Sequence, residues 1–247
     1  MIQRIPVAPA NRLLASLPAR TRQKFLASCD LVELRLEQIL CESGDVISHV
    51  YFPLDSFISL VTRLDDGARL EVGIVGYEGM LGASVILGVK SYPQHALVQG
   101  AGGCLRMPAA TFSRYCRDDR ALQHGFNGYV YVLMRQLALT AACTHYHVIE
   151  ARLARWLLLT RDRANSDNFH MTHEFLALML GVRRVGITEA AGALHARKLI
   201  TYRRGQIAIL DGVGLEKVSC RCYRQANSMY EQTLGKARHK ASGNARQ

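Results

Sequence analysis

The sequence contains no hydrophobic run of about 18 residues, which excludes an ordinary membrane-spanning helix. Residues 1–25 alternate basic and apolar side chains, and they lack the continuous apolar core of a secretory signal peptide. We therefore expect a cytoplasmic protein that has no membrane partner.

The sequence also lacks the residue patterns on which common enzymes depend. No Ser/His/Asp arrangement, phosphate-binding glycine loop or carboxylate pair occurs in a context that supports catalysis. The seven cysteines are an odd number in a chain without an export signal, which favours free thiols in a reducing compartment. The sequence thus predicts a protein that is not an enzyme and that holds no cofactor.

Positive charge is present in excess and is unevenly distributed. The chain has 31 Lys and Arg against 20 Asp and Glu, a net charge of +11. Residues 1–110 hold ten of each, so residues 111–247 carry the whole excess. Such asymmetry indicates a nucleic acid or an anionic membrane surface as partner, although a solvated basic face is the simpler alternative.

Glycine and short β-rich segments characterise the first half of the chain. Ten of the twenty glycines lie between Gly44 and Gly103, among segments that are rich in β-branched residues. Turn signals such as Asp66-Gly67 separate these segments, which predicts hairpins in a small antiparallel barrel or sandwich. The segments are HVYFPLDSFISLVTRL (49–64), ARLEVGIV (68–75) and HALVQGAGGCLRM (95–107).

Residues 121–164 follow a helical pattern that only Gly125 and Gly128 interrupt. Six residues on it are spaced alternately by four and three, as in a coiled-coil seam. The seam could face a partner helix or the protein's own β-domain, and spacing alone does not decide between them. Its residues are Phe126, Val130, Leu133, Leu137, Thr140 and Thr144.

Residues 172–194 predict two short helices joined by a turn. Thr172 can cap the first helix, and Gly181 suits a left-handed helix terminus. The second helix opens with Arg183 and Arg184. The predicted buried residues are Leu176, Met179 and Leu180 in the first helix and Ile187, Ala191 and Leu194 in the second. This is the pattern of a helix-turn-helix, whose second helix enters the DNA major groove.

A predicted β-hairpin, KLITYRRGQIAIL (198–210), follows the second helix directly. A hairpin in this place is the wing of a winged helix. Arg203 and Arg204 at its tip would contact the sugar–phosphate backbone and hold position without selecting sequence.

At this point the chain resembles the cyclic-AMP receptor protein/fumarate-nitrate regulator (Crp/Fnr) family of bacterial transcription factors. The segments that carry the resemblance are ESGDVISHVYFPLDSFISLV (42–61), DGARLEVGIVGYEGMLG (66–82), ARLARWLLLTRDR (151–163), MTHEFLALMLGVRR (171–184), KLITYRRGQIAILDGVGLE (198–216) and CRCY (220–223).

The resemblance implies an α+β protein with three parts. These are a cyclic-nucleotide-binding-like β-roll sensor domain over residues 13–117, a long dimerisation helix over 118–147 and a winged helix-turn-helix over 148–223. The resemblance favours a partner helix as the surface that covers the seam, in a two-fold dimer. The implied partners are a second copy of the chain, double-stranded DNA with a pseudo-palindromic operator, and RNA polymerase.

The resemblance also implies which residues contact DNA. Arg184 matches an arginine that contacts guanine, whereas Val185 replaces an acidic residue that contacts a base and offers only methyl groups. Glu189 stands where the cyclic-AMP receptor has a second base-contacting arginine, so this protein is expected to prefer another operator. The predicted DNA-binding residues are Thr172, His173, Arg183, Arg184, Thr188, Glu189, Arg203 and Arg204.

The sensor domain departs from the family's cyclic-nucleotide site. Ala83 stands where relatives have a glutamate for the ribose, and Gln94 stands where they have an arginine for the cyclic phosphate. The expected effector pocket comprises Gly79, Gly82, Ala83, Gln94 and His95, and the departures predict a sensor that no longer responds to cyclic nucleotides.

Three further site hypotheses concern metal and thiols. Cys143, His147 and Glu150 share one face of the predicted helix and could hold a metal, but packing or capping is the favoured interpretation, so no metal is predicted. Cys220 and Cys222 form a lone Cys-x-Cys, a weak zinc signal. The remaining cysteines lack the spacing of iron–sulfur members of the family.

Two alternative functions remain open. A regulator of the same fold could sense haem, metal or redox state. A cyclic-nucleotide-responsive signalling module could instead act on a protein partner, although the basic residues of the second helix and the wing argue against that.

Overall fold

The structure, a computed structural model, describes residues 11–65, 67–164 and 166–235. The start of the segment in which no signal peptide is expected lies outside these residues, and so does Asp66 of the expected turn. No helix in the described ranges is long and apolar enough to cross a membrane.

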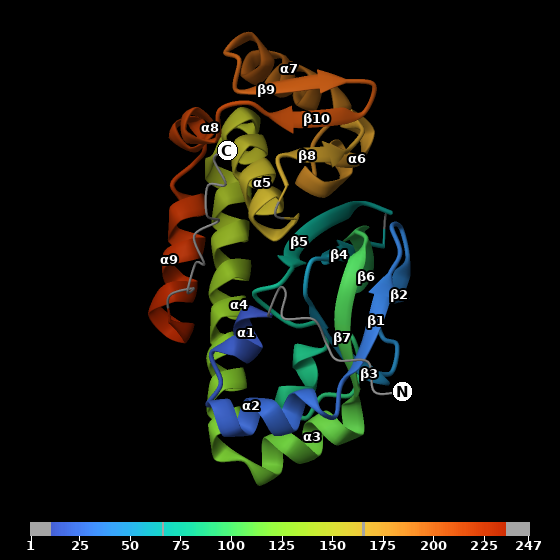
Figure 1. The fold of residues 1–247 in the computed structure, drawn as a ribbon. Coiled ribbons are helices and arrows are strands. Elements are labelled where there is room, and N and C mark those ends of the chain that lie inside the picture. The colour runs from blue at the N-terminus through green and yellow to red at the C-terminus, as the bar shows by residue number, and fades with distance from the viewer. Residues whose placement is uncertain (1–10, 66, 165, 236–247) are drawn as a thin grey trace.

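The first domain is a β-roll closed at one end by helices (Figure 1). Its strands form two antiparallel sheets with the orders β1-β7-β3 and β2-β6-β4-β5. The helical elements are α1 (Arg12–Ala15), α2 (Ala19–Leu26), the 3₁₀ helix η1 (Ala83–Leu87) and α3 (Ala109–Asp118). The strands are β1 (Asp30–Leu34), β2 (Ile39–Cys41), β3 (His49–Pro53), β4 (Phe57–Arg63), β5 (Arg69–Val75), β6 (His95–Gly100) and β7 (Gly102–Pro108).

Only one of the hairpins expected in the first domain forms within a single sheet. Strands β4 and β5 pair as the turn signal predicts, but β3 and β4, like β6 and β7, belong to different sheets. The chain crosses between the sheets where the Asp55 carboxylate accepts a hydrogen bond of 2.6 Å from the Gly103 amide. Gly102, with φ of 151°, leaves room there, since a Cβ would lie 2.6 Å from the same carboxylate. This tertiary contact overrides the local hairpin signal.

The long helix α4 (Arg120–Tyr146) is continuous through Gly125 and Gly128, which the sequence pattern treats as interruptions. A helical glycine costs about 1 kcal/mol relative to alanine. Close packing favours glycine at position 125 despite that cost, because the Cβ of an alanine there would come within 2.9 Å of Leu17. The helix ends instead at His147, whose extended backbone separates α4 from α5 (Ile149–Ala164).

Most of the predicted seam on α4 faces the protein's own fold, although Leu137 is exposed. Phe126 is fully buried in the core of that domain, and Leu133 packs against the same core. Thr140 and Thr144 line a groove shared with α5. A different stripe, offset from the seam, remains exposed and keeps the alternating spacing of three and four: Tyr131, Met134, Ala138, Ala141 and His145.

The second domain is a winged helix-turn-helix at the far end of α4 (Figure 1). Its sheet has the order β8-β10-β9, and the short strand β8 has no counterpart in the sequence prediction. The last helix, also unpredicted, returns along α4. The elements are β8 (Asn168–His170), α6 (His173–Leu180), α7 (Arg184–Ala196), β9 (Ile200–Arg203), β10 (Gln206–Ile209), α8 (Gly212–Val218) and α9 (Cys222–Leu234).

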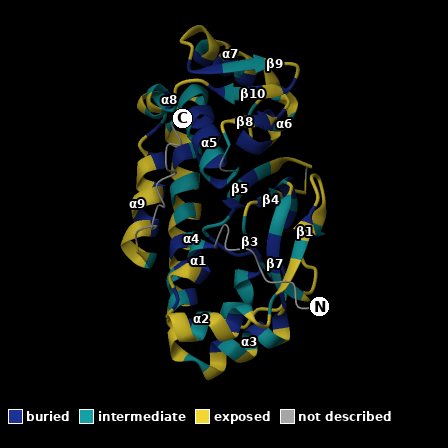
Figure 2. Ribbon diagram, viewed as in Figure 1, coloured by how far each residue is buried: buried dark blue, intermediate teal, exposed yellow. Residues whose placement is uncertain are grey.

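One hydrophobic cluster spans the two domains. Phe57, Val61 and Ile74 of the β-roll pack in the same cluster as the buried face of α5 and the helix-turn-helix. Figure 2 shows α5 as one of the most buried elements, whereas α9 carries much exposed surface. The second domain is therefore docked on the first rather than tethered to it.

Candidate functional site

The helix-turn-helix has the caps that its sequence predicts. The Thr172 hydroxyl accepts a hydrogen bond of 3.1 Å from the Phe175 amide and so caps α6. Gly181 ends α6 in the left-handed conformation, with φ of 61°. The six predicted core positions of the two helices are all buried: Leu176, Met179, Leu180, Ile187, Ala191 and Leu194.

These buried positions leave the first turn of α7 open to solvent. Arg183 caps the helix, and Arg184 begins it, and both are exposed. Val185 and Glu189 are exposed as well. The positive end of the helix dipole and the two guanidinium groups together favour a polyanion at this point.

A polar and aromatic contact fixes the start of α6 against α7 and the wing. The His173 ring stacks on Tyr202 with ring centroids 4.1 Å apart. Its Nδ1 lies 3.1 Å from the hydroxyl of Thr188, which also donates to the Arg184 carbonyl. Burial, with Arg184 nearby, lowers the pKa of His173 and so favours the neutral ring. His173 and Thr188 thus join the start of α6 to the exposed first turns of α7.

The wing ends in a tight two-residue turn. Arg204 and Gly205 both have positive φ, 50° and 81°, as a type I′ turn requires. Arg203 and Arg204 are exposed at this tip. The structure therefore gives the domain two basic features, the start of α7 and the wing tip, on the part of the molecule that lies farthest from α2 and α3 (Figure 1).

An apolar cavity of about 200 Å³ lies between the β-roll and α4. Its described lining contains no charged side chain. It includes Gly82, Ala83 and Gln94 from the predicted effector pocket, together with Val130, Leu133 and Leu137 of α4. This lining suits an uncharged ligand rather than an anion.

Two residues of the predicted pocket lie elsewhere. Gly79 is not part of the cavity lining and packs against Tyr129, whose hydroxyl would collide with a Cβ at that position. His95 is buried, and its Nδ1 lies 2.7 Å from a carboxylate oxygen of Glu42, outside the cavity. The structure thus brings together three of the five predicted residues.

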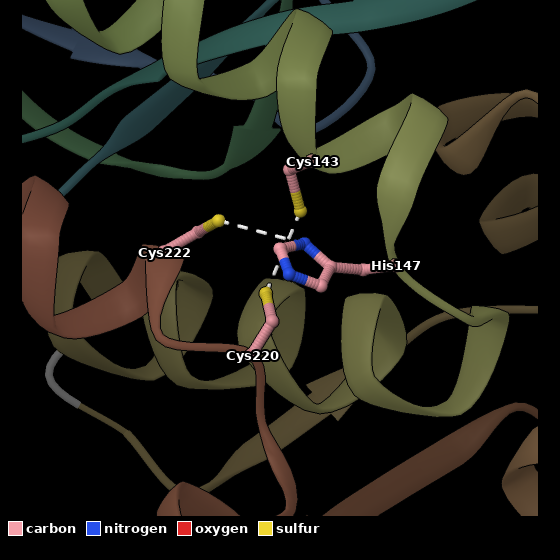
Figure 3. A group of neighbouring side chains, drawn as sticks. All are labelled: Cys143, His147, Cys220 and Cys222. Atoms are coloured by element: carbon pink, nitrogen blue, oxygen red, sulfur yellow. Dashed lines mark hydrogen bonds between the residues drawn. The ribbon is translucent and has the colours of Figure 1, made fainter.

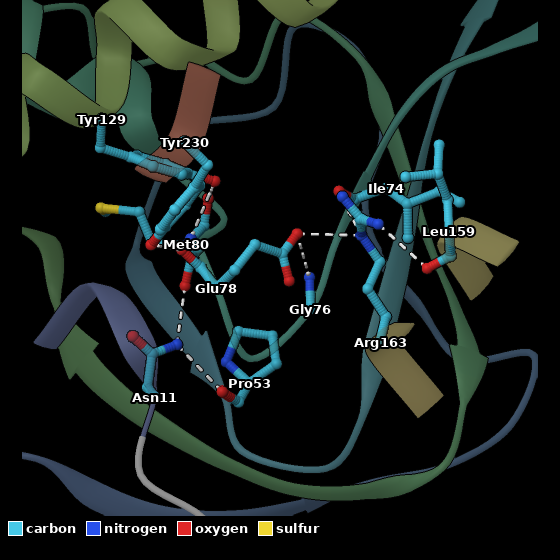
Figure 4. Close-up of polar contacts among 11 residues, drawn as sticks. Asn11, Pro53, Ile74, Gly76, Glu78, Met80, Tyr129, Leu159, Arg163 and Tyr230 are labelled. Carbon is cyan, nitrogen blue, oxygen red and sulfur yellow. Dashed lines mark hydrogen bonds and ion pairs between the residues drawn. The ribbon is translucent and has the colours of Figure 1, made fainter. Parts of the chain in front are cut away.

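A buried ion pair joins the β-roll to the second domain (Figure 4). Arg163 Nε of α5 lies 2.9 Å from Glu78 Oε1, and both side chains are largely buried. The same guanidinium donates to the carbonyls of Leu159 and Ile74. Tyr230 of α9 donates to the Glu78 carbonyl, so three parts of the chain meet here.

Glu71 of β5 forms a second polar contact across the domain boundary. Its carboxyl group accepts hydrogen bonds from Trp156 Nε1 at 2.7 Å and from the Ser59 hydroxyl at 2.5 Å. Burial raises the pKa of Glu71 from 4.5 to about 7, and the two hydrogen bonds oppose that rise. Sequence reasoning missed this residue, because nothing local distinguishes it from an exposed strand glutamate.

Glu71 should make stability depend on pH. Between the unfolded pKa of 4.5 and the folded pKa of about 7, the unfolded carboxyl has lost its proton while the folded one still binds it. Stability therefore falls by about 2–3 kcal/mol as the pH rises from 5 to 8. Glu71→Gln keeps the shape of the side chain without titrating, because its amide oxygen can accept from Trp156 while its NH2 group donates to the Ser59 hydroxyl. The unfolding free energy of the variant minus that of the parent should be about 2–3 kcal/mol larger at pH 8 than at pH 5. Urea unfolding of both proteins at both pH values measures this difference. An unchanged difference between the two proteins would contradict the shifted titration.

The proposed trio of Cys143, His147 and Glu150 does not share one helical face. Because α4 ends at Tyr146, Glu150 belongs to α5 and pairs with Arg197 at 3.0 Å. Cys143 and His147 do lie together, and the Cys-x-Cys of residues 220–222 joins them. Burial raises the pKa of the other four thiols to about 12 and keeps them unreactive: Cys29, Cys41, Cys104 and Cys116.

Two family models match the chain and together cover most of the described domains. Residues 31–119 match a cyclic nucleotide-binding domain, and residues 151–218 match a Crp-like helix-turn-helix domain. No curated protein sequence matches the chain.

Solved structures share the whole architecture at low sequence identity. FixK2 from Bradyrhizobium japonicum is similar with a TM-score of 0.66 and 14% identity, over 78% of this chain and 98% of that one. A CRP-family transcriptional regulator from Thermus thermophilus has a TM-score of 0.64 and 19% identity, over 76% and 96%. The c-di-GMP responsive global regulator CLP from Xanthomonas campestris has 0.64 and 14%, over 78% and 99%. At these identities the likeness shows the fold.

Proposed function

The chain belongs to the Crp/Fnr family of transcription regulators, and on that premise we propose that it acts as a homodimer on a pseudo-palindromic operator. The family and the fold are those of DNA-binding regulators and not of enzymes. The observation that carries the proposal is the exposed Arg183–Arg184 pair at the start of α7, beside a wing whose tip is also basic. As a regulator of transcription it would act in the cytoplasm, through RNA polymerase.

The exposed stripe on α4 supports the dimer. Tyr131, Met134, Ala138, Ala141 and His145 are spaced as a coiled-coil seam requires, and all are exposed in the single chain. Small residues in the middle of the stripe allow two helix backbones to approach closely. A second copy of α4 is the partner that matches this spacing.

Selection of bound sites from random DNA tests the proposal directly. We expect the recovered sites to contain inverted half-sites about one helical turn, ~34 Å, apart. A monomer in sedimentation, combined with no shift of any DNA pool at low salt, would rule the proposal out.

Ala141→Glu should separate the two copies, because it places like charges opposite each other on the stripe. We expect a monomer in sedimentation and a loss of operator affinity of about a hundredfold or more, as for a bivalent ligand reduced to one site. Gln123→Glu, an exposed position off the stripe on the same helix, is the matched control and should remain dimeric. If Ala141→Glu remained dimeric, the interface between the two copies would lie elsewhere.

Substitution of Arg184 and substitution of a wing arginine should affect DNA binding differently. Arg184→Ala is expected to cost about 1–3 kcal/mol and to relax the preference at one G·C pair in each half-site, because it removes a base contact. Arg204→Ala should weaken operator and random DNA equally, because it removes a phosphate contact. Titration of both DNAs with both variants distinguishes the roles. Equal losses for Arg184→Ala would show that it contacts only the backbone.

We assign the effector, if the cavity takes one, to uncharged apolar molecules. The cavity lining carries no charge in its described part, and most of it comes from the residues that match a cyclic nucleotide-binding domain. Ala83 and Gln94 cannot supply the charges that a cyclic nucleotide requires. Burial raises the pKa of four thiols and keeps them unreactive, so they give no support to redox sensing: Cys29, Cys41, Cys104 and Cys116.

A further inference from the structure

Four potential metal ligands meet where α4 ends and where α9 begins. Cys143 lies in the last turn of α4, and His147 ends that helix one turn later. Cys220 and Cys222 come from the link between α8 and α9, more than 70 residues further along the chain. Figure 3 shows the three sulfur atoms gathered around the His147 imidazole. We propose that these residues form a Cys₃His site for a single zinc-like ion.

The spacing of the ligand atoms fits one tetrahedral ion. All four atoms lie within 4.8 Å of one another. The Cys143 and Cys220 sulfurs are 3.5 Å apart, and the Cys222 sulfur is 3.6 Å from His147 Nδ1. Zinc–sulfur bonds of ~2.3 Å and zinc–nitrogen bonds of ~2.0 Å in a tetrahedron imply ligand separations of about 3.5–3.8 Å. The ligands therefore need only small shifts to coordinate.

The composition of the cluster also favours a metal over a disulfide. Three thiolates and one imidazole are a ligand set of structural zinc sites, and soft sulfur ligands select zinc over magnesium or calcium. A disulfide between Cys143 and Cys220 would leave Cys222 and His147 unused. All seven cysteines are free in the structure.

The surroundings are those of a closed, structural site. The three cysteines are buried, and Leu139 and Ala151 pack against them. Arg155 Nη1 lies 3.8 Å from the Cys143 sulfur, so a cation stands beside a centre whose three thiolates exceed the charge of one divalent ion. No fifth ligand is needed, and none of the predicted DNA-contacting residues takes part.

The location gives the ion a mechanical role. Residues 143–149 connect the long helix to α5, and residues 219–222 connect α8 to α9. An ion bound to both segments would fasten the two ends of the DNA-binding domain to one point on α4. It would set the angle of that domain without touching DNA.

Metal analysis of the full-length protein, purified under reducing conditions without chelator, tests the site. We expect one zinc per chain. After removal of the zinc, Co²⁺ titration should produce thiolate-to-cobalt charge-transfer bands and the intense visible bands of tetrahedral cobalt at one equivalent. Hydrogen exchange should accelerate at residues 143–149 and 219–222 in the metal-free protein and slow again when Zn²⁺ is added.

Variants identify the ligands. Cys222→Ala and His147→Ala should each weaken Zn²⁺ binding beyond the ~10–100-fold that loss of an outer contact costs. Cys116→Ala, a buried thiol in the β-roll, is the matched control and should keep full affinity. The cobalt spectrum of the parent protein decides the matter even if a variant does not fold. Absence of metal with no cobalt–thiolate band, or a Cys143–Cys220 disulfide under reducing conditions, would overturn the proposal.

Discussion

Operator affinity should fall by about a thousandfold when salt rises from 50 to 200 mM. Arg183, Arg203 and Arg204 offer three phosphate contacts in each copy of the chain, and a dimer doubles them. With about six contacts, the logarithm of the binding constant falls against the logarithm of salt concentration with a slope near −5. The cause is release of counterions from DNA, so the effect belongs to the backbone contacts and not to the base contacts.

Removal of the wing arginines provides the internal test of this slope. The double variant Arg203→Ala/Arg204→Ala should flatten it to about −2, because only the contacts of Arg183 remain in this count. Arg35→Ala, an exposed arginine between β1 and β2, should leave the slope unchanged. Equal slopes for the parent and the double variant would remove the wing from the DNA interface.

Cyclic AMP and cyclic GMP should bind at least about a thousandfold more weakly than a micromolar ligand. Their phosphate stays anionic at pH 7, and in a cavity with no charged lining its burial costs several kcal/mol. Ala83 in place of a carboxylate removes a further charge-assisted hydrogen bond, worth about 1.5–3 kcal/mol. Because each 1.4 kcal/mol is tenfold, the two losses move micromolar affinity beyond millimolar.

No neighbouring cation compensates for these losses in the described structure. Lys90 is exposed, and His95 is held by Glu42 outside the cavity. Calorimetric titration with each nucleotide, alongside DNA binding with and without it, checks the prediction. The variant Gln94→Arg, which puts a cation on the cavity wall, should bind cyclic AMP more tightly than the parent. Saturable micromolar binding by the parent, coupled to tighter DNA binding, would restore the ordinary cyclic-nucleotide switch.

The helix-turn-helix was predictable because its signals are local. Thr172 and Gly181 fix the two ends of α6 through contacts within a few residues, and the apolar spacing of α7 selects its buried face. The predicted caps and core positions are confirmed. The wing turn likewise depends on two adjacent residues with positive φ.

The missed features depend on contacts between distant segments. Strand pairing in the β-roll follows the Asp55–Gly103 contact, which no turn propensity encodes. Residues 220–222 meet Cys143 only because α9 folds back along α4, and α9 was not predicted although its buried residues have helical spacing. For the same reason spacing alone left two possible partners for the seam on α4, because it identifies a face of the helix but not the surface that covers that face.

The cavity beneath α4 sets an energetic threshold for any allosteric control of this protein. To move a population from 1:99 to 99:1, an effector must bind one state about 5.5 kcal/mol more tightly than the other. At about 25 cal/mol per Å² this difference corresponds to roughly 220 Å² of apolar surface that is covered in one state alone. One aromatic side chain covers about that much. A single ring-sized apolar group, seated in about 200 Å³, would therefore supply a shift of this size if one state alone covered it.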